Sequence, residues 1–393
     1  MMRVLHLFKA YMPESTGGIE QTIFQLCEAC KPLGVENSVL TLSPAPADTP
    51  LQVGSHQVHQ ARQDINLAST GLSRQVFKRF RELAREHDVV HYHFPWPLMD
   101  LLHFHAAHGK PSVLSYHSDI VRQKVLLQLY RPLMHRFLSS VDRIVTASPN
   151  YLATSDVLAH YKHKTDVIPY GLNKTAYDDI DPERLAYWRQ QFPDGFFLFV
   201  GVMRYYKGLH ILLDACKDTD YPVVIVGAGP LENTLRQQAQ RLRLHNVYFL
   251  GPLPDPEKNV LLQLSRVVVF PSHLRSEAFG ISLLEGAMFG KPMISSEIGT
   301  GTTYINIDGE TGLVVPPSDP TALRDAMQRL WHNHAMAQQL GETAAKRYEL
   351  LFSAERMAKQ FSELYEKLLY DSPSPPVHRH STSSPDSTGG RCP

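Results

Sequence analysis

Two glutamates separated by seven residues carry the clearest chemical signal in this sequence. Glu277 and Glu285 lie in the segment Ser276-Glu-Ala-Phe-Gly-Ile-Ser-Leu-Leu-Glu285, just after the apolar run Val267–Phe270. A buried strand followed by a helix that begins near Gly280 would point free backbone N–H groups and the positive end of the helix dipole at an anion. A diphosphate suits that position. Glu277 would then lie beside the group attached to the diphosphate, and Glu285 inside the helix could accept hydrogen bonds from ribose hydroxyls.

The alternative for such a pair is two surface glutamates flanking an amphipathic helix, which is the usual case for an arbitrary spacing. The residues between the two glutamates favour a buried turn instead. They are small or apolar, and we assign them to the same anion site: Ala278, Phe279, Gly280 and Ile281.

Two cations follow another apolar run in the second half of the chain. Arg204 and Lys207 come after residues 196–200 and precede Gly208. Cations at this place could neutralise two phosphates and stabilise a departing diphosphate, replacing a metal ion. The alternative is a pair of solvated surface charges. We expect Arg204 and Lys207 to act in catalysis and in binding.

Two further features follow apolar runs in the first half. Gly17 and Gly18 come after residues 3–8, where they would let phosphates approach the backbone closely or let the loop adopt positive φ. His117 follows residues 113–116, at the strand end where open α/β sheets place ligands. Plain alternatives are an ordinary turn and a structural histidine. We expect Gly17 and Gly18 to bind an anionic ligand and His117 to be catalytic.

Strand-like and helix-length segments alternate through both halves of the chain, which predicts two parallel sheets covered by helices. The 393 residues suit two domains. We expect an α/β protein of two domains, each built on a parallel sheet. The predicted boundaries are a first domain at 1–172, a polar linker at 173–194, a second domain at 195–354, a final helix at 355–370 and a disordered tail at 371–393.

Composition restricts the partners and the compartment. The formal net charge is zero and the pI is about 7.4, so nucleic acid is not expected as a partner. Four cysteines do not make a disulfide framework, and the N-terminus does not resemble a signal peptide. We expect a cytoplasmic protein whose membrane contact, if it has any, is peripheral on the inner face of the plasma membrane.

Several patterns suggest other chemistry but are discounted. Gly227-Ala-Gly229 lacks the third glycine of a dinucleotide motif, and Asp218-Thr-Asp220 precedes a strand, at the wrong edge for a metal-bound diphosphate. Cys27 and Cys30 fall inside a helical pattern. We expect no metal and no organic cofactor, although one group of residues is rich enough in histidine to raise the question: His91, His93, His103, His105 and His108.

The paired-glutamate segment resembles that of the retaining GT-B glycosyltransferases, family four in particular. Further segments that resemble the family occur in the family's order along nearly the whole chain: Gly17-Gly-Ile-Glu20, Ser115-Tyr-His-Ser-Asp119, Gly201-Val-Met-Arg-Tyr-Tyr-Lys-Gly208, Val226-Gly-Ala-Gly-Pro230, Gly299-Thr-Gly-Thr302 and Asp308-Gly-Glu-Thr-Gly-Leu313. One position departs from the family pattern. Val202 stands where members commonly carry an arginine, so Arg204 would supply that charge.

The resemblance implies two Rossmann-like domains that face a central cleft, with a nucleotide-sugar donor in a site closed between them. It also implies a last helix that crosses back onto the first domain. His117 would contact the transferred sugar, and Glu277 would hold sugar hydroxyls while the leaving phosphate accepts the acceptor's proton on the same face. The segments at 93–99 and 299–304 resemble those of bacterial enzymes that use GDP-mannose in O-antigen synthesis. That similarity implies mannose transfer from GDP-mannose, with GDP-rhamnose or a UDP-sugar as alternative donors.

The acceptor leaves fewer signals. Basic residues interleave with apolar ones at 72–87 and 122–138, a pattern of helices that lie on anionic lipid or of ordinary packed surface helices. A glycolipid or growing oligosaccharide acceptor at the membrane would explain helices that lie on anionic lipid. Two other functions stay open on this architecture: an epimerase or phosphorylase, and a sugar-nucleotide sensor without turnover.

Overall fold

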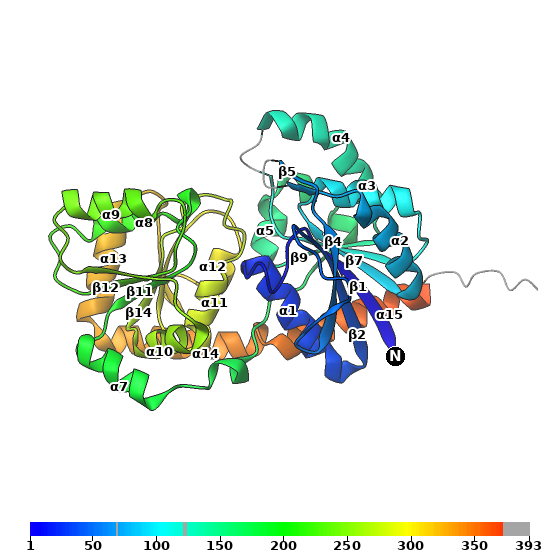
Figure 1. The fold of residues 1–393 in the computed structure, drawn as a ribbon. Helices are drawn as coiled ribbons and strands as arrows, with labels where there is room; N and C mark the ends of the chain where they lie inside the picture. Colours follow the sequence, from blue (N-terminus) through cyan, green and yellow to red (C-terminus); the bar gives the residue numbers. More distant parts are fainter. Residues whose placement is uncertain (68–69, 121–123, 372–393) are drawn as a thin grey trace, which may run out of the picture.

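The computed structural model describes residues 1–67, 70–120 and 124–371, and it shows two α/β lobes side by side (Figure 1). Apart from Asp371, the predicted disordered tail lies outside the described residues. Each lobe is built on a largely parallel sheet, so the predicted fold class is confirmed.

The first sheet has the strand order β10-β9-β8-β7-β1-β2-β4-β3, with all neighbours parallel except the β3–β4 pair. Its central strand β7 is buried at every residue because helices cover both faces. The strands of this lobe are β1 Met2–Leu7, β2 Val35–Ser43, β3 Leu51–Val53, β4 His56–Arg62, β7 Val89–Phe94, β8 Ser112–Tyr116, β9 Arg143–Thr146 and β10 Thr165–Val167, with a separate hairpin of β5 Ile65–Leu67 and β6 Thr70–Leu72.

Helices connect these strands. They are α1 Gly18–Cys30, η1 Lys31–Leu33, α2 Gln75–Glu86, α3 Pro97–Ala106, α4 Lys124–Ser140, α5 Pro149–Thr154, α6 Asp156–Ala159 and η2 Lys162–Lys164. The strands β3 to β6 are not predicted from the sequence. Each of β3, β5 and β6 is three residues long and shows too little alternation to be recognised, and the seven residues of β4 are mostly polar, without the apolar run of a buried strand.

The second sheet is entirely parallel, with the order β13-β12-β11-β14-β15-β16. Its strands are β11 Phe197–Val200, β12 Val223–Val226, β13 Val247–Gly251, β14 Val267–Phe270, β15 Met293–Ser296 and β16 Gly312–Val315. Its helices are η3 Lys174–Tyr177, α7 Pro182–Gln191, η4 Tyr205–Lys207, α8 Leu209–Ala215, α9 Glu232–Arg241, α10 Asp255–Leu264, α11 Ile281–Met288, α12 Thr302–Ile305, α13 Pro320–His332 and α14 His334–Leu351.

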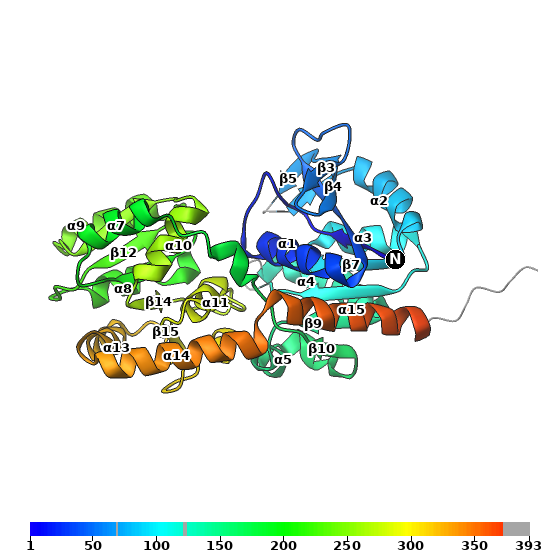
Figure 2. The same cartoon turned by 90° about the horizontal axis from the view of Figure 1, so that it is seen from below.

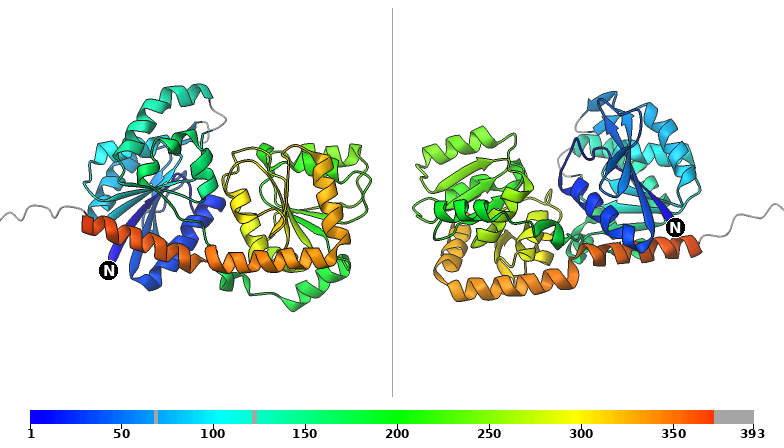
Figure 3. Two further views of the ribbon diagram at one scale, coloured as in Figure 1. Left: turned by 180° about the vertical axis from the view of Figure 1, so that it is seen from behind. Right: turned by 60° about the horizontal axis from the view of Figure 1, so that its bottom comes forward.

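The last helix, α15 Ala354–Asp371, leaves the second lobe and packs along the first (Figures 2 and 3). The chain therefore crosses between lobes twice, and the two crossings meet where Leu172 forms a parallel bridge with Ser353. Gly171 is required there, since a Cβ at this position would collide with the backbone carbonyl of Ser353.

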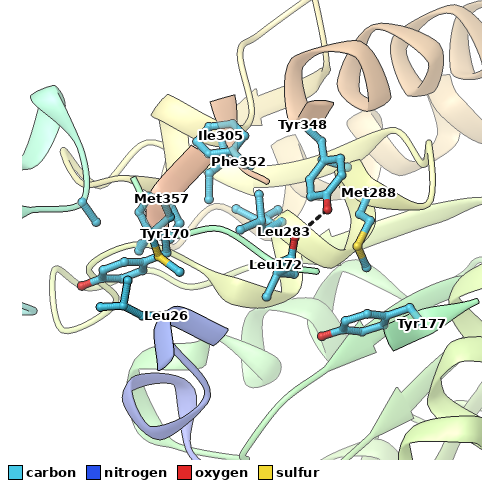
Figure 4. Close-up of a cluster of buried hydrophobic side chains, with 14 of the residues drawn as sticks. Leu26, Tyr170, Leu172, Tyr177, Leu283, Met288, Ile305, Tyr348, Phe352 and Met357 are labelled. Carbon is cyan, nitrogen blue, oxygen red and sulfur yellow. Dashed lines mark hydrogen bonds between the residues drawn. The ribbon is translucent and has the colours of Figure 1, made fainter. Parts of the chain in front are cut away.

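A shared apolar core holds the junction of the lobes. Leu26 and Tyr170 from the first lobe pack in one buried cluster with Leu283 and Phe352 (Figure 4). The hydroxyl of Tyr348 donates to the carbonyl of Leu172 at 2.8 Å. The apolar side chains buried from both lobes stabilise the junction. The loops that follow β1, β8 and β14 meet there.

Candidate functional site

The turn that carries the paired glutamates follows β14, and α11 begins at Ile281 directly after it. Gly280 has φ +103°, which an L side chain rarely adopts, and a Cβ there would lie 3.3 Å from the ring of Phe270. The glycine thus allows the chain to turn sharply from strand into helix. The free N–H groups of α11 lie at the carboxyl end of β14, as the sequence predicts.

Glu277 forms an ion pair with Lys207, with 2.5 Å between the carboxylate Oε2 and Nζ. Both side chains are 12% exposed, so the pair is partly shielded from water. Ser272 donates to the same carboxylate oxygen at 3.3 Å. Two residues predicted independently from sequence are therefore in direct contact.

Lys207 is held between aromatic rings at the end of η4. Its Nζ lies 4.8 Å from the ring centre of Phe270 and 5.6 Å from that of Tyr206. Gly208, with φ +70°, permits the close approach of this turn to the carbonyl of Pro271. The two aromatic rings and the Glu277 carboxylate hold the ammonium group of Lys207 in place.

Arg204 is exposed, and its positive charge acts electrostatically on Lys9 in the first lobe. Burial lowers the pKa of Lys9; the Glu20 carboxylate opposes this, and Arg204 adds to it. Lys9 and Glu20 therefore lie close enough to Arg204 to be counted among the charged residues of the candidate site. Sequence reasoning missed Lys9 as a site residue, although a cation directly after the first strand was the available signal.

Gly17 and Gly18 form the start of α1. A Cβ on Gly18 would lie 3.7 Å from Cγ1 of Ile281, so the first loop faces the start of α11 across the junction. Gly17 has φ −71°, so the backbone is not left-handed at this residue in the structure. What the two glycines provide is a close approach of backbone.

Glu285 is 4% exposed and has two partners that the sequence did not predict. Lys258 Nζ lies 2.9 Å from Oε1, and the hydroxyl of Tyr177 donates to the same oxygen at 3.2 Å. Burial alone would lower the pKa of Lys258, but the Glu285 and Asp255 carboxylates raise it above its ordinary value. The buried carboxylate of Glu285 thus has a cation and a hydroxyl donor as partners on one oxygen.

Ala278 and Phe279 connect this turn to its surroundings. The carbonyl of Ala278 accepts from the N–H of Gly301 at 2.8 Å. Phe279 is buried, and its ring centre lies 4.7 Å from that of Tyr170, in the first lobe. The turn is thus packed against both lobes.

His117 lies at the carboxyl end of β8 and is 5% exposed. Its ring nitrogens are both engaged: Nε2 with Nδ1 of His93 at 2.9 Å, and Nδ1 with the hydroxyl of Tyr170 at 2.5 Å. Burial lowers its pKa to about 3, so the ring is neutral. The structure places His117 at the junction but with its ring committed to protein partners.

Of the discounted patterns, the acidic pair and the two cysteines lie apart from this site, whereas the histidine group reaches it through His93. Asp218 and Asp220 precede β12, at the opposite edge of the second sheet. Cys27 and Cys30 are buried in α1, and burial raises the pKa of Cys30 to about 12. His103 and His108 both contact the hydroxyl of Tyr92. The imidazoles of His91 and His93 stack on each other, and His93 also contacts His117.

The two basic amphipathic segments differ in structure. The apolar stripe of α2 is buried against the lobe, including Val76 and Phe80, so it is an ordinary packed surface helix. In α4, Leu126 and Leu129 are 52% and 79% exposed. Among the described residues, no helix has the length and apolarity needed to cross a bilayer.

Comparison with known proteins gives matches along both lobes. A model of glycosyltransferase family 4 matches residues 16–175, and a model of the glycosyl transferases group 1 matches residues 189–347. D-rhamnosyltransferase WbpZ of Pseudomonas aeruginosa is 65% identical over 90% of this chain and 93% of its own length. O-antigen chain mannosyltransferase C of Escherichia coli is 50% identical over 94% of this chain and 99% of its own.

Solved structures share the fold at low identity. Anabaena HepE in complex with UDP and glucose superposes with a TM-score of 0.75 at 19% identity, covering 93% of this chain and all of that one. WaaG, a glycosyltransferase involved in lipopolysaccharide biosynthesis, gives 0.68 at 16% identity, with 92% and 99% covered. The two-lobed GT-B fold and the family models thus agree with the extended identity to the two bacterial transferases, and the chain belongs to the group 1, family 4 glycosyltransferases.

Proposed function

We propose that this glycosyltransferase moves mannose from GDP-mannose to a glycolipid or growing polysaccharide in O-antigen synthesis. The choice of sugar and pathway rests on the 50% identity to O-antigen chain mannosyltransferase C, which extends over nearly the full length of both chains. The observation that carries the chemistry is the Lys207–Glu277 ion pair beside the start of α11.

We orient the donor in the junction by the charged groups that would hold it. Its diphosphate lies at the free N–H groups of α11 and beside Lys207 and Arg204, whose charges replace a metal ion. Lys258 and Tyr177 both contact Oε1 of Glu285, so we assign Oε2 to the ribose hydroxyls. The sugar then lies between Glu277 and the loops that follow β1 and β8.

Retention follows from a front-face reaction. The bond between the anomeric carbon and the diphosphate oxygen breaks, the acceptor oxygen bonds to that carbon on the same face, and the acceptor's proton passes to the leaving phosphate. Glu277 is already paired with a cation and hydrogen-bonded by Ser272, an arrangement that suits holding sugar hydroxyls better than nucleophilic attack.

D-rhamnose is the second candidate sugar, and the 65% identity to D-rhamnosyltransferase WbpZ favours it. The two sugars differ at the 6-hydroxyl. A site that hydrogen-bonds this hydroxyl would reject the deoxy sugar strongly, whereas an apolar pocket would discriminate weakly.

We expect sugar transfer to persist without metal. Purified protein in EDTA is incubated with GDP-mannose, GDP-D-rhamnose and a UDP-sugar panel, together with bacterial glycolipid acceptors, and the released nucleotide and the product anomer are measured. Transfer from GDP-mannose with retained configuration supports the proposal, and preference for GDP-D-rhamnose selects the second candidate. Activity restored only by Mn²⁺ contradicts metal independence. Donor binding without transfer to any acceptor indicates a sensor.

The exposed leucines of α4 make this helix, and not α2, our proposed contact with the inner face of the plasma membrane. Arg131 is exposed on the same helix, as expected for an anionic surface. We expect the protein to float with vesicles containing phosphatidylglycerol at low salt, and Leu126→Ser/Leu129→Ser to reduce this binding about tenfold. Val76→Ala in α2 is the control for a general loss of folding. Equal binding of the wild type and the double variant would exclude α4.

A further inference from the structure

A continuous line of hydrogen bonds runs through the interior of the first lobe to the junction. His6 Nε2 lies 3.1 Å from Oδ1 of Asn37, and His6 Nδ1 lies 3.0 Å from Nε2 of His93. His93 Nδ1 then contacts His117 at 2.9 Å, and His117 contacts Tyr170 at 2.5 Å. We call these five residues, Asn37, His6, His93, His117 and Tyr170, the histidine relay.

The sheet explains why the three rings align. His6 lies on β1 and His93 on β7, and these strands are neighbours; His117 directly follows β8, the next strand. The ring planes of His93 and His117 are 12° apart with centres separated by 5.2 Å. Parallel strands present these side chains on one face, although 87 residues separate His6 from His93.

Asn37 sets the direction of every bond in the relay. Its amide Nδ2 donates to the carbonyl of Cys27 at 3.3 Å, so Oδ1 faces His6 and accepts from Nε2–H. A neutral His6 must then accept at Nδ1 from His93 Nε2–H, and His93 Nδ1 must accept from His117 Nε2–H. His117 Nδ1 is left to accept from the hydroxyl of Tyr170.

The relay carries no charge near neutral pH. Burial lowers the pKa of His6 and of His117 to about 3, and burial and its histidine neighbours hold the pKa of His93 well below its ordinary value. A protonated ring here would be shielded from solvating water, and no carboxylate of the described residues is hydrogen-bonded to these rings to stabilise its charge. Each histidine therefore keeps one tautomer.

A metal ion is the alternative for this cluster, since ligand atoms of His6, His91 and His93 lie within 4.8 Å of one another. Hydrogen bonds already account for all six of these ring nitrogens. Those of His91 contact Ser115 and the hydroxyl of Tyr365 on α15, each at 2.7 Å. The protein partners thus satisfy the rings without an ion.

The other end of the relay reaches the donor turn. Tyr170 packs its ring on Phe279, two residues after Glu277. The hydrogen bond to His117 holds the Tyr170 ring in place, and the turn that carries Glu277 packs against this ring through Phe279.

We propose that His6 and His93 are positioning residues for sugar transfer. They fix the tautomer of His117 and the hydroxyl of Tyr170, so that the His117 ring stays neutral and immobile, its backbone is held in place beside the sugar, and it does not exchange a proton. This inference rests on the proposed function for its kinetic effect, but the tautomers can be observed without turnover.

The kinetic test compares His93→Leu, which removes both hydrogen bonds, with His93→Gln, which keeps a donor and an acceptor. We expect His93→Leu to lower kcat about tenfold with donor KM changed less than about twofold, and His93→Gln to recover most of the loss. On a His117→Leu background, His93→Leu should add less than about twofold, because it acts through His117. Asn37→Leu, at the far end, should lower kcat in the same direction by less.

His87→Leu is the matched control, since His87 is a buried histidine outside the relay that bonds to the carbonyl of Leu83. An equal fall of kcat in this control, or additive effects of His93→Leu and His117→Leu, would reduce the relay to general packing and overturn the proposal.

The second readout is the ¹⁵N spectrum of the histidine rings in full-length protein, assigned by loss of signals in the variants. We expect His6, His93 and His117 as Nε2–H tautomers, unchanged from pH 8 to pH 5. Titration of His93 or His117 in this range, the opposite tautomer, or Zn²⁺ retained after EDTA and lost in His6→Gln would overturn the relay. A wild type that shows the tautomers but no sugar transfer would refute the proposed function alone.

Discussion

Glu277→Gln is expected to lower kcat for sugar transfer about 100- to 1000-fold, with little change in donor KM. The substitution keeps the shape of the side chain but removes the charge that holds Lys207 at 2.5 Å. Lys207 is then free to adopt other positions, and the sugar loses a charged hydrogen-bond acceptor. Both effects act when negative charge develops on the departing diphosphate, so they affect kcat more than binding.

The measurement is steady-state transfer with the nucleotide product quantified, using Glu342→Gln as the control. Glu342 is an exposed glutamate on α14 whose carboxylate accepts from Gln338. We expect this control to keep wild-type activity. A Glu277→Gln enzyme within about threefold of the wild type would remove Glu277 from the catalytic site.

Glu285→Gln is expected to weaken binding of GDP about 10- to 100-fold and to destabilise the fold by about 1 to 3 kcal/mol. The carboxylate is buried and shares one oxygen with Lys258 and Tyr177. Its loss leaves the Lys258 ammonium with the exposed Asp255 as its other ion-pair partner and removes the charged acceptor assigned to the ribose.

Titration calorimetry with GDP and urea unfolding measure the two effects separately. Asp255→Asn is the control because it removes the other carboxylate that pairs with Lys258. The Asp255 side chain is 80% exposed, so this ion pair contributes little to stability. We expect its free energy of unfolding to change by less than about 0.5 kcal/mol. Unchanged GDP affinity in Glu285→Gln, with reduced stability, would make Glu285 a structural residue only.

The sequence predicts the parts of the site that depend on local pattern. The apolar run Val267–Phe270, the glycine at 280 and the helix after it are specified within about twenty residues, because strand burial, positive φ and helical periodicity are local properties. The same reasoning places Lys207 and Gly18 in turns after strands. The repeated alternation of strands and helices predicts two parallel-sheet domains, and the resemblance of the motifs to the GT-B family implies how these domains face each other.

Tertiary structure decides which of these parts meet. Lys207 and Glu277 are 70 residues apart, and their pairing depends on β11 lying next to β14. Lys258 on α10 and Tyr177 on η3 gain a role only because the fold brings both side chains to Glu285 on α11. The histidine relay depends in the same way on the order β8-β7-β1, in which strands far apart in sequence become neighbours. Residue types and local periodicity determine the elements and the candidate groups, whereas strand order and lobe docking fix distances, tautomers and burial, since these depend on contacts between segments that share no local sequence signal.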